Sequence, residues 1–253
     1  TTIFMKLEEK LKNHFLYKKK LNLLKILYFY FQFLKSKFKP RFINANWGLD
    51  KIICDIFKKK NKGVYVDVGC HHPFINNNTY LLNKRGWKGI NIDLDFNSID
   101  MFNFFRRSDY NQKIALSNYK GFSDLYFFHN RAAKNTISKK SGVGAKIIKK
   151  IEVDTLNNVI KKCKFQIKEI DFLSIDVEGN ELNVLKGLNF KKFKPKVVVL
   201  EYIKPSIKEF YQHKIENIMK SKIYKFMKRK NYKLVNWVHD DLVFVPSKII
   251  RFK

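Results

Sequence analysis

Short apolar runs recur along the chain from Gly63 onward and alternate with helix-like segments. Strands that alternate with helices are typical of a parallel sheet covered on both faces. The runs predicted as strands of this sheet are 64–68, 89–94, 113–117, 171–177 and 196–203. The predicted helices lie near 78–86, 97–107, 155–164, 180–188 and 206–230.

Two further patterns refine this architecture. Runs 124–130 and 150–156 interrupt the alternation and predict an extra strand pair, which brackets the basic loop 131–150. Runs 232–238 and 241–246 predict a terminal hairpin with a short polar turn. A doubly wound sheet closed by such a hairpin is the architecture of class I methyltransferases. We therefore expect an α/β, Rossmann-like, mostly parallel seven-stranded sheet with a C-terminal antiparallel hairpin.

The first 62 residues differ from the rest and are predicted to be a helical segment, basic and aromatic, that precedes a domain of residues 63–253. Residues 21–34 are almost entirely apolar, and as a helix they would extend about 21 Å, less than a bilayer core of about 30 Å. Pro40 is expected to end this helix. Two interpretations remain: packing on the main domain, which we favour, or contact of residues 15–39 with an anionic membrane surface.

The charge of the chain is strongly positive but uneven. Lys and Arg total 52 against 22 Asp and Glu, a formal net charge of +30, yet Lys supplies 45 of the 52. A genome rich in A/T codons would also produce such a composition. Arg, which binds phosphate and bases in bidentate fashion better than Lys does, is scarce. Residues 1–62 have a net charge of +12, whereas residues 63–124 have only +1. The charge therefore favours an anionic acceptor or a membrane surface over nucleic acid.

The nearly neutral stretch contains the first two candidate binding residues. In VYVDVGCHHP, Asp67 and Gly69 follow an apolar strand, and ligands of doubly wound folds lie at the carboxyl ends of strands. Asp93 ends the next strand, where a carboxylate can accept hydrogen bonds from ribose hydroxyls; Asp95 is the alternative. The full glycine set of a dinucleotide site is absent, so a nucleoside cofactor without phosphate fits better. A turn with a capping Asp67 is the competing structural interpretation.

The strongest chemical signal is IDFLSIDVEGNELNVLKG at residues 170–187. A buried strand is followed within six residues by Asp176, Glu178 and Glu181. The preference of helix N-termini for acidic residues explains Glu181 but not Asp176. The pattern predicts a catalytic site.

These segments resemble the FkbM family of S-adenosylmethionine-dependent methyltransferases. The resemblance rests on VDVGCHHPFINNNTY, GWKGINIDLD, IALSNYKG, VDTLNNV, the 170–187 stretch and PKVVVLEY, and it covers residues 63–246. It implies O-methylation of a sugar, glycan or small-molecule hydroxyl, in surface-glycan or natural-product biosynthesis. Together with the motifs, it marks as cofactor-binding Asp67, Gly69, Cys70, Asn78, Thr79, Asp93, Ala115 and Leu116.

We expect Asp176 to be the base or a metal ligand, Glu178 to be the second choice and Glu201 to support them. A Mg²⁺ ion at Asp176 and Glu178 is an alternative that no ligand spacing establishes. His71 and His72 could serve as base or ligand, although an isolated histidine is more often structural.

Two other functions compete with this one. The charge alone would suit an RNA-directed methyltransferase, but no lysine is convincingly placed for RNA 2′-hydroxyl chemistry and no stacking platform is evident. A non-catalytic module of the same fold is disfavoured by the retained acids at 67, 93, 176 and 178. The basic loop 131–150 could cover the site and hold an anionic acceptor. Three isolated cysteines predict a reducing cytoplasm, with the membrane contact placed at the inner face.

Overall fold

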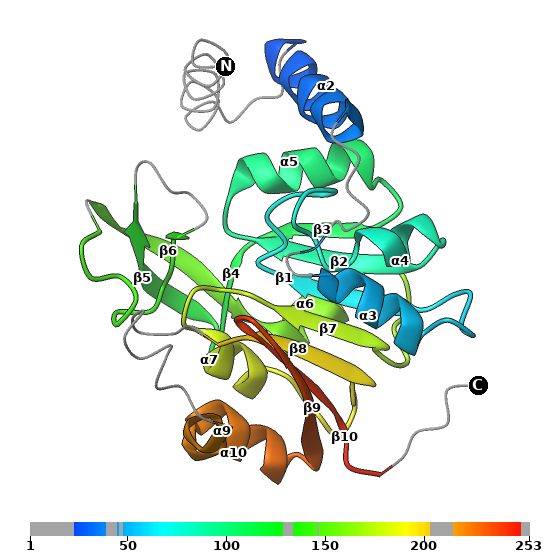
Figure 1. The fold of residues 1–253 in the computed structure, drawn as a ribbon. Helices are drawn as coiled ribbons and strands as arrows, with labels where there is room; N and C mark the ends of the chain where they lie inside the picture. Colours follow the sequence, from blue (N-terminus) through cyan, green and yellow to red (C-terminus); the bar gives the residue numbers. More distant parts are fainter. Residues whose placement is uncertain are drawn as a thin grey trace.

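The computed structural model describes residues 23–38, 45, 48–128, 134–145, 147–202 and 215–248. The strands of its main sheet are β1 (Val64–Val68), β2 (Lys88–Asp93), β3 (Tyr110–Lys113), β7 (Phe172–Ile175), β8 (Val197–Glu201), β9 (Tyr232–Val238) and β10 (Asp241–Pro246). They lie in the order β3-β2-β1-β7-β8-β10-β9 (Figure 1). Neighbours from β3 to β8 are parallel, and β10 is antiparallel to both β8 and β9. The predicted doubly wound sheet with its terminal hairpin is confirmed.

A second sheet of three strands stands beside the first, on the left in Figure 1. Its strands are β4 (Ala115–Ser117), β5 (Gly121–Phe127) and β6 (Ile147–Thr155). The antiparallel pair of β5 and β6 is the predicted extra strand pair, and β4 joins it parallel to β6. The prediction of a single strand over 113–117 was wrong. The chain leaves the main sheet at Ile114, whose N–H donates to the carbonyl of Asp93 at 3.0 Å, and continues into the second sheet.

The described helices are α2 (Leu23–Phe38), α3 (Leu49–Ile56), α4 (Tyr80–Lys84), α5 (Phe96–Phe105), α6 (Leu156–Lys161), α7 (Glu181–Lys186), α9 (Ile215–Lys220) and α10 (Lys222–Arg229). Polar side chains fix several starts: the Asp95 carboxylate accepts the N–H of Asn97 at the start of α5, and Thr155 does the same for Asn158 at α6. The predicted helix 206–230 falls within the described residues only from 215 onward. Within the described residues it consists of two helices, α9 and α10, separated by Ser221, which caps the start of α10.

Alternation along β1 explains why helices cover both faces of the main sheet. Tyr65 and Val66 are fully buried, but successive side chains of a strand point to opposite faces. Tyr65 packs in one apolar cluster with Trp87 and with Phe57, which follows α3. Val66 packs in the larger cluster on the other face, to which α6, α7 and α10 contribute. This burial on both sides accounts for the uninterrupted apolar runs seen in the sequence.

Helix α2 lies against α5 (Figure 1). The rings of Phe33 and Phe105 stack with centroids 5.5 Å apart, and the buried Lys25 ammonium forms an ion pair with Asp100. Helix α2 therefore contacts the main domain, as the packing interpretation predicts. The predicted stop at Pro40 lies outside the described residues. No helix in the described part of the chain is long and apolar enough to cross a bilayer.

The strand order places the candidate site. From β1 the chain proceeds toward β2 and β3 on one side, whereas from β7 it proceeds toward β8 on the other side. Loops that follow β1 and β7 therefore diverge at the carboxyl ends of two adjacent strands. A crevice opens at this kind of position in doubly wound sheets, and ligands bind there.

Candidate functional site

The loop after β1 approaches the chain after β7 very closely. The N–H of Gly69 donates to the carbonyl of Ile92 at 2.8 Å, and the N–H of Asp176 donates to the carbonyl of Val68 at 2.9 Å. Gly69 has a φ of +77°, and a Cβ on it would lie 1.6 Å from the Asp176 carbonyl oxygen. Only glycine fits this position, because it needs both a left-handed backbone and no side chain.

A cavity of about 320 Å³ lies at these strand ends. Its volume is in the range of small-molecule sites. Seven of the residues predicted from the sequence line it: Gly69, Asp93, Ala115, Leu116, Asp176, Glu178 and Glu201. The structure thus brings together candidate cofactor residues from β1, β2 and β4 and candidate catalytic residues from β7 and β8.

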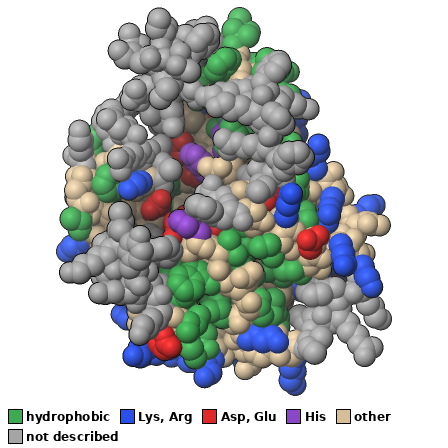
Figure 2. Space-filling model, in the orientation of Figure 1, with side chains coloured by type: hydrophobic (Ala, Val, Ile, Leu, Met, Phe, Trp, Pro, Cys, Tyr) green, Lys and Arg blue, Asp and Glu red, His purple; other side chains and the backbone are tan. Residues whose placement is uncertain are grey.

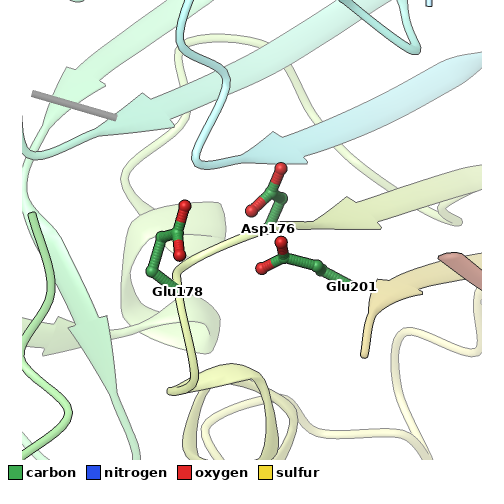
Figure 3. Close-up of side chains that lie close together, drawn as sticks. All are labelled: Asp176, Glu178 and Glu201. Atoms are coloured by element: carbon green, nitrogen blue, oxygen red, sulfur yellow. The ribbon is translucent and has the colours of Figure 1, made fainter. Parts of the chain in front are cut away.

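Three carboxylates converge on one side of this cavity (Figure 3). Asp176 and Glu178 come from the turn after β7, and Glu201 ends β8. One ligand atom from each lies within 4.8 Å of the others. In the space-filling view, acidic and histidine side chains gather near the centre of the face shown (Figure 2).

The acids perturb one another's protonation. Asp176 is open to the cavity, but the protein surrounding it disfavours its charge and raises its pKa to about 7; the charges of Glu178 and Asp241 act in the same direction. Burial and the charge of Asp176 raise the pKa of Glu201, and a side-chain hydrogen bond joins the two groups. Near neutral pH the pair therefore shares a proton, which Glu201 holds as the donor.

Glu178 lies in a strained turn that several groups hold in place. Glu178 has a φ of +55° and Gly179 a φ of +97°. The buried Glu181 carboxylate accepts the N–H of Val177 at 3.1 Å and that of Gly179 at 2.9 Å. The Thr136 hydroxyl donates to the carbonyl of Glu178 at 2.9 Å. Glu181 therefore shapes the turn, and the strain is located at the acidic cluster, where functional strain is commonly found.

Burial also raises the pKa of the Glu178 carboxyl, and the positive charge of Lys134 opposes that shift. Lys134 is exposed and belongs to the basic loop, of which residues 134–145 and 147–150 are described. Asn135, Thr136 and Ile137 from the same loop line the cavity. The loop therefore borders the site, although residues 131–133 and 146 lie outside the described part.

Asp93 has the position expected of a ribose-binding acid. Its Oδ2 accepts the N–H of His71 at 2.9 Å, and its Oδ1 accepts the N–H of Asp95 at 2.8 Å. Each carboxylate oxygen can accept a second hydrogen bond. Burial, followed by the charge of Asp95, raises its pKa to about 7, while the two backbone bonds lower it. His71 and Asp95 also line the cavity.

Four predicted cofactor residues do not line the cavity, and their side chains make contacts within the fold. Asp67 is buried, and its Oδ2 accepts bonds from Asn77 Nδ2 at 3.0 Å and from the Thr79 hydroxyl at 2.9 Å. Thr79 is fully buried, and Cys70 is buried in a small cluster with residues of α5. Asn78 Nδ2 donates to the Ser174 hydroxyl at 3.1 Å. These contacts match the competing interpretation of Asp67 as a residue that holds a turn.

His72, the second histidine of the loop, is also absent from the cavity lining. Its Nδ1 accepts the N–H groups of Phe74 and Ile75 at 3.3 and 3.2 Å, so it stabilises the loop. His71, by contrast, remains a candidate for contact with a ligand.

Sequence reasoning missed three residues that the site depends on. Arg106 is buried beneath the loop after β1, where its guanidinium donates to Thr79 Oγ1 at 2.9 Å and to Asn77 Oδ1 at 2.8 Å. Asn180 lines the cavity and donates to the carbonyl of Leu116 at 2.8 Å. Asp241, the first residue of β10, pairs in register with Glu201, and its charge helps to raise the pKa of Asp176. Only Asn180 was signalled, because it lies inside the 170–187 motif.

The sheet order and the strand-end cavity are those of the class I methyltransferase fold. The chain belongs to the FkbM methyltransferase family, since the model of the methyltransferase FkbM domain matches residues 67–234. A comparison with curated proteins gives no match.

Among solved structures, the chain is similar to a TehB-like SAM-dependent methyltransferase from Corynebacterium glutamicum. The two are 12% identical with a TM-score of 0.40, over 88% of this chain and 97% of the other.

Proposed function

We propose that this methyltransferase transfers a methyl group to a hydroxyl oxygen of a sugar, a glycan or a small-molecule acceptor. The observation that supports this most directly is the pair of Asp176 and Glu201 beside the cofactor residues. A hydroxyl group needs a base before it can act as a nucleophile, and a carboxylate whose pKa is near 7 is suited to that task.

The cavity fits the cofactor that the family uses. Asp93 has acceptor capacity for ribose hydroxyls, and the close approach at Gly69 keeps that part of the wall free of side chains. Leu116 and Ala115 supply an apolar wall from β4. S-adenosylmethionine, when bound, supplies an electrophilic methyl group on a sulfonium.

Asp176 performs the proton transfer in this proposal. Because Glu201 keeps the shared proton, the Asp176 carboxylate is free to accept the proton of the acceptor hydroxyl. Deprotonation would leave the acceptor oxygen free to attack the methyl group that a bound cofactor would supply, with S-adenosylhomocysteine as the leaving product. Positioning of the hydroxyl by the residues around the cavity supplies the rest of the catalysis. Asp176 then releases the proton to solvent through the open side of the cavity.

A Mg²⁺ ion is a second way to activate the hydroxyl at the same three carboxylates. Oxygen ligands suit this ion, and the Oε2 atom of Glu201 is buried without a hydrogen-bond partner among the described residues. The cluster thus fits the group. In that case Asp176, Glu178 and Glu201 would hold the ion, which would lower the pKa of a bound hydroxyl.

The position of the basic loop 131–150 supports the proposal that the acceptor carries an anionic group. Lys134 lies close enough to lower the pKa of Glu178, and Asn135 and Thr136 beside it line the cavity. A phosphate or carboxylate at the rim could pair with Lys134 while the hydroxyl faces Asp176.

Calorimetric titration with S-adenosylmethionine and S-adenosylhomocysteine tests the cofactor site. We expect Asp93→Ala to weaken both affinities, because it removes the ribose acceptor. Asp176→Asn should bind the cofactor nearly as the wild type does but lose about 10²–10⁴-fold in turnover. Full turnover by Asp176→Asn would contradict its assignment as the base.

Acceptor chemistry needs a separate measurement. Glycans and phosphorylated sugars are incubated with ¹³C-methyl-labelled cofactor, and the product is examined by NMR for a methyl ether. Dependence of turnover on added Mg²⁺ after chelation would favour the metal alternative, and equal turnover in chelator would exclude it. Methylation of nitrogen or carbon would contradict the proposal.

A further inference from the structure

Helix α2 has two faces of different character. Its inner face carries Lys25 and Phe29, which are 0% and 1% exposed, and Phe33, which stacks on Phe105 of α5. Its outer face leaves large apolar side chains in contact with solvent. These are Leu23 (73% exposed), Leu27 (55%), Tyr30 (50%), Phe31 (42%) and Leu34 (50%).

The exposed residues follow the helical repeat and form one stripe, which we call the outer stripe. Positions 23, 27, 30, 31 and 34 fall at spacings of four, three, one and three residues, so they share a side of the helix. Hydrophobic side chains also reach the surface at the top of Figure 2, where Figure 1 shows α2. A contiguous apolar surface of this kind marks an interaction site, whereas scattered apolar residues do not.

The charge of the surrounding chain indicates what kind of surface it contacts. Residues 10–49 contain ten Lys and Arg residues and no Asp or Glu. Lys25 forms an ion pair with Asp100. The other nine basic residues of 10–49 lie in the sequence before and after the outer stripe. An apolar helix face flanked by lysines is complementary to a bilayer that carries anionic headgroups.

We propose that the outer stripe of α2 binds the surface of an anionic lipid bilayer, with the helix lying in the plane of the interface. Its 16 residues span about 24 Å, which suits a helix lying along the surface better than one crossing it. Pairing with a second copy of this chain is less favourable, because it would bring two segments of the same positive charge together.

The inner face of α2 connects this surface to the cofactor loop. The ring of Phe33 contacts that of Phe74 at 5.6 Å, and Phe74 contacts Phe105 at 5.1 Å. Phe74 belongs to the loop after β1, in which His71 and Asn76 line the cavity. A bilayer that holds α2 would thereby fix the cavity at a defined height above the lipid, where a lipid-linked acceptor could reach it.

Vesicle co-sedimentation of the full chain tests the proposal independently of methyl transfer. The vesicles contain phosphatidylcholine alone or phosphatidylcholine with phosphatidylglycerol. The test variant is Leu27→Gln with Leu34→Gln, which removes apolar surface without a change in charge. The matched control is Phe122→Gln with Ile148→Gln, since these residues are 67% and 58% exposed on the second sheet.

We expect the wild type and the control to bind the vesicles that contain phosphatidylglycerol. Their binding should be weaker at high salt, and weaker on vesicles of phosphatidylcholine alone. The test variant should bind at least about tenfold more weakly, because two leucines no longer enter the interface. Thermal unfolding and cofactor titration check that both double variants are folded.

Two results would overturn the proposal. One is that the wild type does not bind anionic vesicles. The other is that the test variant and the control bind equally, since charge alone would then account for the binding. Sedimentation equilibrium tests the alternative, pairing with a second copy of the chain. If the wild type is a dimer and the test variant is a monomer, the outer stripe serves self-association instead.

Discussion

Replacement of Gly69 by alanine probes the contact on which the whole site is built. The added Cβ would lie 1.6 Å from the Asp176 carbonyl oxygen, whereas ordinary contacts begin near 3.4 Å. The loop after β1 and the chain after β7 would therefore have to separate by about 1.8 Å, the difference between these values. Such a movement pulls Asp176 away from Glu201 and from the cavity.

The cost of this change has two parts. A left-handed φ costs a residue with a side chain about 1–2 kcal/mol. Separation of the two segments also breaks the hydrogen bonds from Gly69 to Ile92 and from Asp176 to Val68, at about 0.5–1.5 kcal/mol each. We therefore expect Gly69→Ala to lower the free energy of unfolding by about 2–5 kcal/mol.

Gly86 provides a matched control for the first part alone. Its φ is +81°, and a Cβ there would meet nothing within 4 Å. Gly86→Ala should therefore cost only the about 1–2 kcal/mol of backbone strain and keep its affinity for the cofactor. Urea denaturation and calorimetric titration are run on both variants. If Gly69→Ala is no less stable than Gly86→Ala and binds the cofactor equally well, the close approach does not shape the site.

Three further changes test the surroundings of the cavity. Arg106→Leu should lower the free energy of unfolding by about 3–5 kcal/mol in urea denaturation, because buried acceptors beneath the cofactor loop lose their donor. The affinity for the cofactor should rise by up to about tenfold between pH 6 and pH 8, because the ribose hydroxyls donate to ionised Asp93, whose pKa is about 7. Asp93→Asn should remove most of this pH dependence of binding. If the variant keeps the same pH dependence as the wild type, another group is responsible for it. Thr136→Val should lower the free energy of unfolding by about 1 kcal/mol and reduce turnover, because the hydrogen bond to the Glu178 carbonyl is lost. Thermal unfolding and turnover are measured, and unaltered turnover would show that Thr136 does not position the turn that carries Glu178.

The main sheet could be predicted from the sequence because its strands are short apolar runs buried on both faces. The pattern failed at 113–117, where the apolar character continues although the chain changes sheets at Ile114. Apolar runs report burial but carry no information on which sheet buries them. The helix near 206–230 was likewise read as continuous, since Ser221 is an ordinary polar residue unless its cap is seen.

The candidate site could be predicted where the acids follow strands directly. Asp93, Asp176 and Glu201 all line the cavity, because the carboxyl ends of parallel strands meet at one edge. Asp67 lies one residue before the end of β1, and its side chain points to the face that Thr79 and Arg106 occupy. Alternation along the strand determines this difference, and the position of Arg106, almost 40 residues further along, could not be inferred from spacing.

The position of β10 in the sheet has a consequence for how this protein can be divided. The match to the family ends at residue 234, inside β9, whereas β10 inserts between β8 and β9. A fragment truncated at the family boundary would lose the partner of β9 and leave the buried residues of β8 at an open edge. The smallest segment that folds cooperatively must therefore extend at least to Pro246, beyond the residues that the family model matches.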